Sequence, residues 1–204
     1  MLTYLVSGSI FGISAGLSPG PLLTLVIAES IRGGLRSGIR VSLAPLITDL
    51  PIVFVSLLVI SRLSRFDAAL GVISLCGAVF VAYLGYEGLH TKEMSISHED
   101  GGNRSLQKGI IANFLNPHPY LFWFSVGSPI IVKAFAVNVL APCAFVCGFY
   151  VFLVGSKIVL CLVIDRSRSL ISGKAYKYTM QALGAVLVVF AIFLFFEGLG
   201  FLGL

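Results

Sequence analysis

Apolar residues gather in six long stretches that short polar segments separate. Each stretch is mostly uncharged and exceeds the length of about 18 residues that a transmembrane helix needs. The six stretches are Leu2–Ala28, Ile39–Ile60, Ala69–Leu89, Gly109–Val132, Val137–Ile164 and Tyr178–Leu202. They occupy nearly all of the 204 residues. The pattern therefore predicts an all-α integral membrane protein with six transmembrane helices in a single polytopic domain, residues 1–204.

Two proline pairs interrupt the first and the fourth stretch. The pairs are Pro19-Gly20-Pro21 and Pro117-His118-Pro119, and they lie 98 residues apart. A proline removes a backbone donor and clashes with the preceding turn, so we expect both helices to be broken. In a membrane the freed backbone groups must face protein or water. Matched breaks in two halves of a chain indicate a transport site near the middle of the bilayer.

A polar segment at about 90–108 divides the chain into halves of about 1–89 and 109–204. Three spans in each half place the second half in the opposite orientation to the first. We therefore predict two inverted three-helix repeats, with the broken helices at their starts and a cytoplasmic loop between them.

The charges indicate topology and not a charged partner. The net charge is +5, but the basic residues lie mainly on one side of the predicted spans. Ten of them follow spans 1, 3 and 5: Arg32, Arg36, Arg40, Lys92, Arg104, Lys108, Arg166, Arg168, Lys174 and Lys177. The other side has Arg62, Arg65 and Lys133. The positive-inside rule then predicts a multi-pass protein of the cytoplasmic membrane with both termini outside, and no basic face suggests nucleic acid as a partner.

Composition and motifs argue against a soluble protein and an enzyme. Charged residues make up 11% of the chain, whereas soluble domains have about 25%. No zinc-protease or nucleotide-binding motif is present, so we expect no enzymatic activity, no cofactor and no metal site. An ion gradient or the membrane potential would have to drive transport.

Asp49 and Lys157 are charged residues that lie away from the ends of their predicted spans. Asp49 lies between Pro45 and Pro51 in the second stretch, and such a carboxyl could bind a proton, a cation or an ammonium group. Lys157 lies about two turns from the end of the fifth stretch. It either extends to the membrane surface, pairs with Asp49 or binds a carboxylate.

Polar residues flank both breaks. Asn113 and Asn116 precede the second break and suit either a ligand or a helix cap. His118 lies inside that break and is a candidate for proton handling. At the first break, Ser18 is a candidate cap for a helix that resumes at Pro19, whose start could bind a carboxylate.

Three further features have structural interpretations. Gly8, Gly12, Gly16 and Gly20 form a stripe for close packing of the first helix inside the chain or, alternatively, for a homodimer contact. Glu29, Glu87 and Glu197 lie near span ends, where we expect interfacial or loop-pairing roles. The aromatic run Tyr120–Phe124 is expected to pack or to face lipid instead of lining a pocket.

Three segments resemble the LysE/RhtB translocators, a family of small exporters of amino acids. They are Gly16-Leu-Ser-Pro-Gly-Pro21, Gly77-Ala-Val-Phe-Val-Ala-Tyr-Leu-Gly85 and Asn113-Phe-Leu-Asn-Pro117. The resemblance covers essentially the whole chain and implies proton-coupled efflux, commonly by a homodimer. The family positions that match are Pro19, Gly20, Pro21, Asn113, Asn116 and Pro117. His118 departs from the family, which usually has a basic residue such as lysine there.

The sequence thus predicts a secondary transporter that exports a small amino acid or a related metabolite, with the proton as coupling ion. The candidate substrate or ion site comprises Asp49, Ser18, Pro19, Gly20, Pro21, Asn113, Asn116, Pro117, His118 and Lys157. Three alternatives remain open at this point: a thiol-relay redox protein, a passive channel and a metal-ion efflux protein. Four cysteines are present, Cys76, Cys143, Cys147 and Cys161, and none lies within twenty residues of a proline pair.

Overall fold

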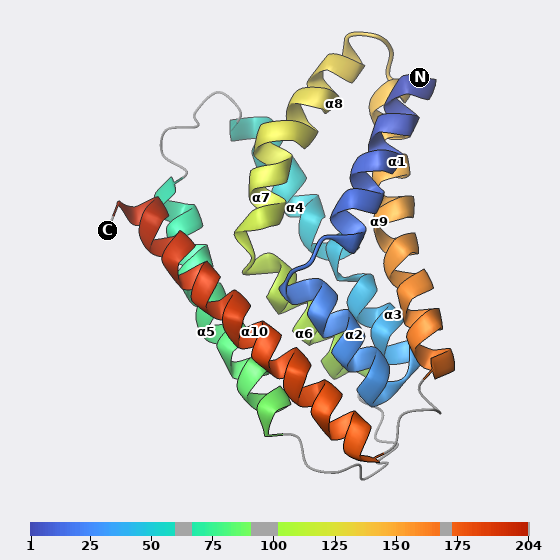
Figure 1. The fold of residues 1–204 in the computed structure, drawn as a ribbon. Coiled ribbons are helices and arrows are strands. Elements are labelled where there is room, and N and C mark those ends of the chain that lie inside the picture. Colours follow the sequence, from blue (N-terminus) through green and yellow to red (C-terminus); the bar gives the residue numbers. More distant parts are fainter. Residues whose placement is uncertain (60–66, 91–101, 168–172, 204) are drawn as a thin grey trace.

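The computed structural model describes residues 1–59, 67–90, 102–167 and 173–203, and in these ranges every regular element is a helix (Figure 1). The elements are α1 (Leu2–Leu17), α2 (Pro21–Gly33), α3 (Leu35–Ser42), α4 (Ala44–Val59), α5 (Asp67–Leu89), α6 (Gly102–Phe114), α7 (Pro117–Phe122), the π-helical turn η2 (Trp123–Gly127), α8 (Ser128–Phe135), α9 (Leu140–Ser167) and α10 (Gly173–Leu202). Most of the polar segment between the expected halves lies outside the described residues, as do Arg62, Arg65, Lys92 and Arg168.

Four helical segments are long and apolar enough to cross a membrane, and a fifth span results if α1 and α2 are counted together. The four are Leu35–Leu58, Gly71–Leu89, Leu140–Ser167 and Lys177–Leu202. The chain is therefore a multi-pass membrane protein. The expected span Gly109–Val132 is divided among α6, α7, η2 and α8, and the count of six spans stays a prediction.

The chain leaves helical geometry at the first proline pair. α1 ends at Leu17, α2 begins at Pro21, and the two axes are bent by 65°. Gly20 is the N-cap of α2 in extended conformation, with Pro21 at the first helical position, where its missing N–H removes no bond. Ser18 is the C-cap of α1. The expectation that the helix resumes at Pro19 with Ser18 as its cap is therefore wrong.

The second proline pair begins a helix. α6 ends at Phe114 and α7 starts at Pro117, with Asn116 as the N-cap. The Asn116 side chain accepts a hydrogen bond of 3.1 Å from the His118 N–H. In Figure 1 this interruption and the one between α1 and α2 both lie near the mid-height of the bundle.

Two helix pairs are packed with glycine at the contact. α1 lies along α9, and α5 lies along α10. A Cβ atom at Gly8 or Gly12 would collide with the carbonyl oxygen of Phe145 or Phe149, respectively. These glycines of the expected stripe therefore serve packing inside the chain, because only glycine permits such close approach of two backbones. Gly20 has open space beside it.

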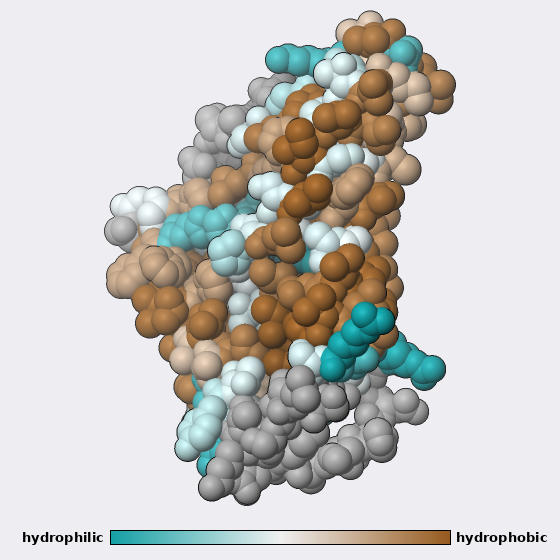
Figure 2. Space-filling model, turned by 45° about the vertical axis from the view of Figure 1, so that its right-hand side comes forward, coloured by the Kyte–Doolittle hydropathy of each residue, from teal (hydrophilic) through white to brown (hydrophobic). Residues whose placement is uncertain are grey.

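The outer surface is apolar, as a lipid-facing surface must be. Large apolar side chains such as Val79, Phe193 and Phe196 are exposed. Figure 2 shows apolar side chains over most of the middle of one face, with hydrophilic atoms mainly toward the ends. One end of the bundle carries Arg32 near the end of α2, Lys108 in the middle of α6 and Arg166 near the end of α9, and is called the basic end below.

Candidate functional site

Asp49 is buried in α4, with only 4% of the residue exposed. One carboxylate oxygen, Oδ1, accepts hydrogen bonds from Asn113 Nδ2 at 2.9 Å and from Thr48 Oγ1 at 3.3 Å. The other, Oδ2, accepts one from Trp123 Nε1 at 3.4 Å. A buried carboxylate needs such donors, because leaving it without partners would cost several kcal/mol. We refer to Thr48, Asp49, Asn113 and Trp123 as the central cluster.

The donors come from both sides of the second break. Asn113 lies in the last turn of α6, one turn before the interruption, and also donates to Thr48 Oγ1 at 2.6 Å. Trp123 lies after it, where α7 passes into η2. The interruption thus lets one broken segment present two donors to the same carboxylate of α4.

Trp123 is fully buried, and its ring is held on several sides. The Trp123 ring is stacked with the Tyr150 ring, with 6.1 Å between the ring centroids. It forms a T-shaped contact with the Phe149 ring, with 5.1 Å between the centroids. Gly127, one π-helical turn later, leaves room for the indole: a Cβ atom there would lie 2.6 Å from Cζ3. Single π-helical turns of this kind often occur at functional sites.

α9 brings two further polar groups toward Asp49. Tyr150 and Lys157 lie seven residues apart, which places them on one helix face, and both interact electrostatically with Asp49. The Tyr150 hydroxyl is buried and has no hydrogen-bond partner among the described residues. Lys157 is 2% exposed, so it does not extend to the membrane surface.

Lys157 and Asp49 do not form a contact ion pair. Within the described ranges, the ammonium group has neither a hydrogen bond nor an ion pair at 4.0 Å or less. Two buried opposite charges are therefore close enough to attract one another but are not joined. In this arrangement the Asp49 carboxylate and the Lys157 ammonium group can each still bind an additional charged group.

The structure brings only some of the expected site residues to this centre. Asp49 and Asn113 are in contact, and Lys157 faces them. Asn116 caps α7 and Pro117 is buried beside it. His118 points elsewhere: its side chain is largely exposed, and Nε2 lies 4.0 Å from Glu197 Oε2 of α10.

The residues at the first break make fewer contacts. Ser18 and Pro19 are exposed, Gly20 is partly buried and Pro21 is buried. Within α2, the Thr24 hydroxyl donates to the Gly20 carbonyl at 3.0 Å. No hydrogen bond joins these residues to Asp49 in the part of the chain that the structure describes.

Trp123 and Tyr150 were not singled out as site residues from the sequence. The expectation that the aromatic run packs or faces lipid accounts for part of it, but Trp123 also donates to Asp49. One signal was available, because Trp123 is the only tryptophan of the chain and follows Asn113 by ten residues.

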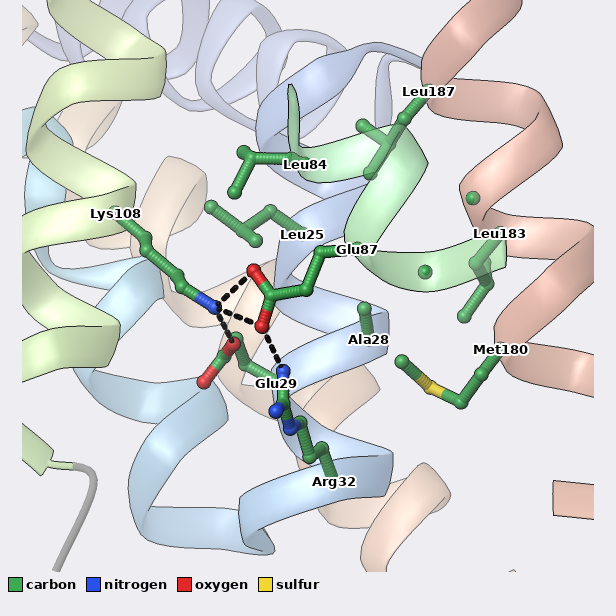
Figure 3. A pocket seen from close by; sticks show the side chains of 12 residues that line it. Leu25, Ala28, Glu29, Arg32, Leu84, Glu87, Lys108, Met180, Leu183 and Leu187 are labelled. Carbon is green, nitrogen blue, oxygen red and sulfur yellow. Dashed lines mark hydrogen bonds and ion pairs between the residues drawn. The ribbon is translucent and has the colours of Figure 1, made fainter. Parts of the chain in front are cut away.

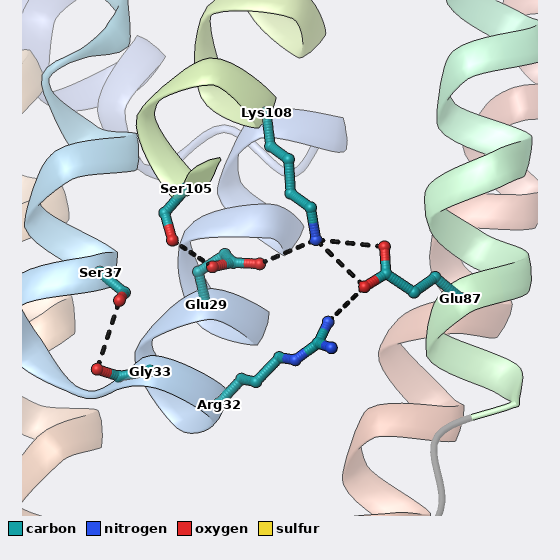
Figure 4. A network of polar contacts seen from close by, with 7 residues as sticks. All are labelled: Glu29, Arg32, Gly33, Ser37, Glu87, Ser105 and Lys108. Carbon is teal, nitrogen blue, oxygen red and sulfur yellow. Dashed lines mark hydrogen bonds and ion pairs between the residues drawn. The ribbon is translucent and has the colours of Figure 1, made fainter. Parts of the chain in front are cut away.

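A second polar group lies at the basic end. Glu29 and Arg32 of α2, Glu87 of α5, and Ser105 and Lys108 of α6 form a continuous network (Figure 4). The sequence predicted interfacial pairing for Glu29 and Glu87. Glu29 is in fact buried, and Ser105 Oγ donates to its Oε2 at 2.5 Å.

Comparison with known proteins gives a family for the chain. Residues 13–198 match the family of LysE type translocators. A protein of Pseudomonas aeruginosa named chemotactic transduction protein ChpE is 25% identical over 132 residues, which is 63% of this chain and 65% of that protein. The match thus spans less than two thirds of the relative's length. No solved structure matches the chain.

Proposed function

Because the chain belongs to the family of LysE type translocators, we propose that it is a secondary transporter that exports a small amino acid or a related metabolite across the cytoplasmic membrane. The family is one of translocators, and the apolar helices make the chain a multi-pass membrane protein. The finer points, namely the substrate, the direction and the coupling ion, are proposals.

The observation that supports a transport centre is the buried Asp49, held by donors from the broken segment α6–η2. A charge inside a membrane is costly, roughly 2.5–3.5 kcal/mol on insertion scales, and is retained chiefly where it has a function. All its donors are neutral. The carboxyl is thus stabilised in place without a fixed cation, and it stays free to take up a proton or an ammonium group.

We place the substrate between Asp49 and Lys157. A small amino acid carries an ammonium and a carboxylate, and the two unjoined charges of the centre complement both. The rings of Trp123 and Tyr150 supply an adjacent apolar wall. Proton coupling follows if a proton and the substrate ammonium compete for the Asp49 carboxyl.

The charge distribution supports an orientation of the protein in the membrane. The positive-inside rule places the basic end in the cytoplasm and both termini outside. Pro19, Gly20 and Pro21 lie at the first interruption, and Asn113, Asn116 and Pro117 lie at or next to the second. Two such interruptions support our proposal of inverted repeats around the centre.

The test has two stages. Metabolites in the medium are compared between cells that lack the protein and cells that overproduce it, which names a substrate without assuming one. The purified protein is then placed in liposomes, and flux of that substrate is measured with and without an imposed pH gradient. Uphill flux that depends on the gradient supports coupled export, whereas flux that only follows the substrate gradient would make the protein a channel.

Asp49→Asn is the decisive variant in this assay. It keeps the shape of the side chain and removes the charge, so we expect transport to be lost while the protein still folds. Glu197→Gln, an acidic residue outside the central cluster, is the matched control. Unchanged flux in Asp49→Asn would refute the assignment of the centre.

A further inference from the structure

The network at the basic end is centred on one lysine. Lys108 Nζ of α6 lies 3.3 Å from Glu29 Oε1 of α2, and 3.2 and 3.1 Å from the two carboxylate oxygens of Glu87 of α5. Arg32 of α2 binds Glu87 as well. Figure 4 shows Lys108 between the two carboxylates, with its ammonium group pointing at both.

The network joins the first half of the chain to α6, which runs from the dividing segment into the second half. Glu29, Arg32 and Glu87 belong to the first half, and Lys108 is the last residue of the dividing segment. Two positive and two negative groups balance one another. The Lys108 and Glu29 side chains are only 15% and 10% exposed, whereas Arg32 is 49% exposed. The lysine is therefore the inner cation, and ion pairs with so little solvent contact are costly to break when one partner is removed.

A pocket adjoins these charges (Figure 3). Its polar side is formed by the network, and α10 contributes only apolar residues and a glycine, among them Met180, Leu183 and Leu187. Its inner wall includes Leu25 and Leu84, which are buried in the core. Leu25 lies one turn further into α2 than Glu29. The pocket thus leads from the basic end toward the interior and is crossed by the ion pairs of Lys108.

We propose that Lys108 closes the entrance to the transport path at the basic end. A solute that reaches the interior through this pocket has to pass between α2, α5 and α6, and Lys108 holds these three helices together by two carboxylates. Opening requires that the lysine leave at least one of them. When it leaves both, Arg32 alone balances the two carboxylates, and the excess negative charge favours separation of the helices. The proposal rests on the transport function proposed above.

The test measures access to the pocket and not transport. In a variant without native cysteines, Leu25→Cys provides a reporter at the inner wall. A small thiol reagent that does not cross membranes is added on the side of the basic end. We expect slow labelling in the parent and labelling faster by about tenfold in Lys108→Met, because removal of one partner of a partly buried ion pair leaves the other charges uncompensated. Lys108→Arg should stay close to the parent.

Lys133→Met is the matched control, because this exposed lysine lies in α8 at the opposite end. Equal labelling of Leu25→Cys with and without Lys108→Met, in protein that is inserted and monodisperse, would overturn the proposal. If Lys108→Met does not fold, Glu87→Gln replaces it. That variant keeps the Lys108–Glu29 pair and should also label faster, and an unchanged rate would again refute the gate.

A triple variant separates repulsion from lost packing. Glu29→Gln and Glu87→Gln added to Lys108→Met remove the facing charges, and labelling should then fall back toward the parent rate. If the triple variant labels as fast as Lys108→Met, the opening comes from the missing lysine stem and the electrostatic gate is wrong. A gate that responds as expected in a protein without substrate flux would refute the transport function alone.

Discussion

Asn113 donates a 2.9 Å hydrogen bond to Asp49, although the two residues are 64 positions apart. Its amide also donates to the Thr48 hydroxyl, so one side chain connects the end of α6 to two consecutive residues of α4. The contact lies one turn before the break at Asn116. Movement of the broken segment therefore changes the surroundings of the buried carboxyl directly.

Asn113→Ala should impair transport more than stability. The change removes one donor to a carboxylate, which is worth about 1.5–3 kcal/mol for a bond to a charged group. We expect flux to fall about ten- to a hundredfold. Asn113→Asp should be more damaging, because it places a second carboxyl against the first. Substrate flux in liposomes is measured for both variants and for the unchanged protein. If both variants transport as fast as the unchanged protein, the Asn113 amide has no role in transport.

Gly127→Ala and Trp123→Phe should both lower flux, because each removes the indole N–H donor from Asp49. The added methyl collides with the indole ring and displaces the donor from Asp49, at a cost of about 1–3 kcal/mol for overpacking. Gly155→Ala is the control, since a Cβ atom there meets nothing within 4 Å. Flux and tryptophan fluorescence are measured together. Normal flux with an unchanged emission spectrum in Gly127→Ala would contradict the prediction.

Gly12→Ala should destabilise the pair formed by α1 and α9. The new Cβ atom meets the Phe149 carbonyl, which belongs to a rigid helix backbone and cannot move away. The thermal midpoint in detergent should drop, with Gly200→Ala, at an open position, as the reference. A midpoint equal to that of Gly200→Ala would mean that α1 is not held as closely as the structure describes.

The pH dependence of transport should survive His118→Ala, because we assign proton binding to Asp49, whose Asn variant should not transport at all. His118 is exposed and faces Glu197, whereas Asp49 faces the buried donors. Initial rates are recorded across the pH range with the substrate gradient held constant. If the transport rate of His118→Ala did not depend on pH, we would assign proton binding to His118 and not to Asp49.

Replacing all four cysteines with alanine should leave flux intact. Cys76, Cys143 and Cys147 are exposed, Cys161 is buried, and all are free. A thiol relay needs paired cysteines at the site of action. Complete loss of activity in a well-folded cysteine-free variant would favour the redox alternative over transport.

Prediction from the sequence was most accurate where a simple physical rule applied. The prolines predicted where α1 and α6 end. The cost of a charge in a membrane singled out Asp49, which is buried. The direction of a side chain is a different matter, because it depends on which helices become neighbours. His118 and Asn113 both flank the second break, yet one faces α10 and the other α4. The same limit explains why Glu29 and Lys108 did not look like partners, since 79 residues separate them.

The separation along the sequence between Asp49 and its hydrogen-bond donors also matters for membrane insertion. Thr48 is its neighbour, but Asn113 and Trp123 follow by 64 and 74 residues. The first half therefore enters the bilayer with a carboxyl that lacks two of its three donors. Until the second half arrives, that helix carries an insertion penalty of roughly 2.5–3.5 kcal/mol if the carboxyl is charged. We therefore expect the nascent chain to keep Asp49 protonated or close to water until α6 and η2 are in place.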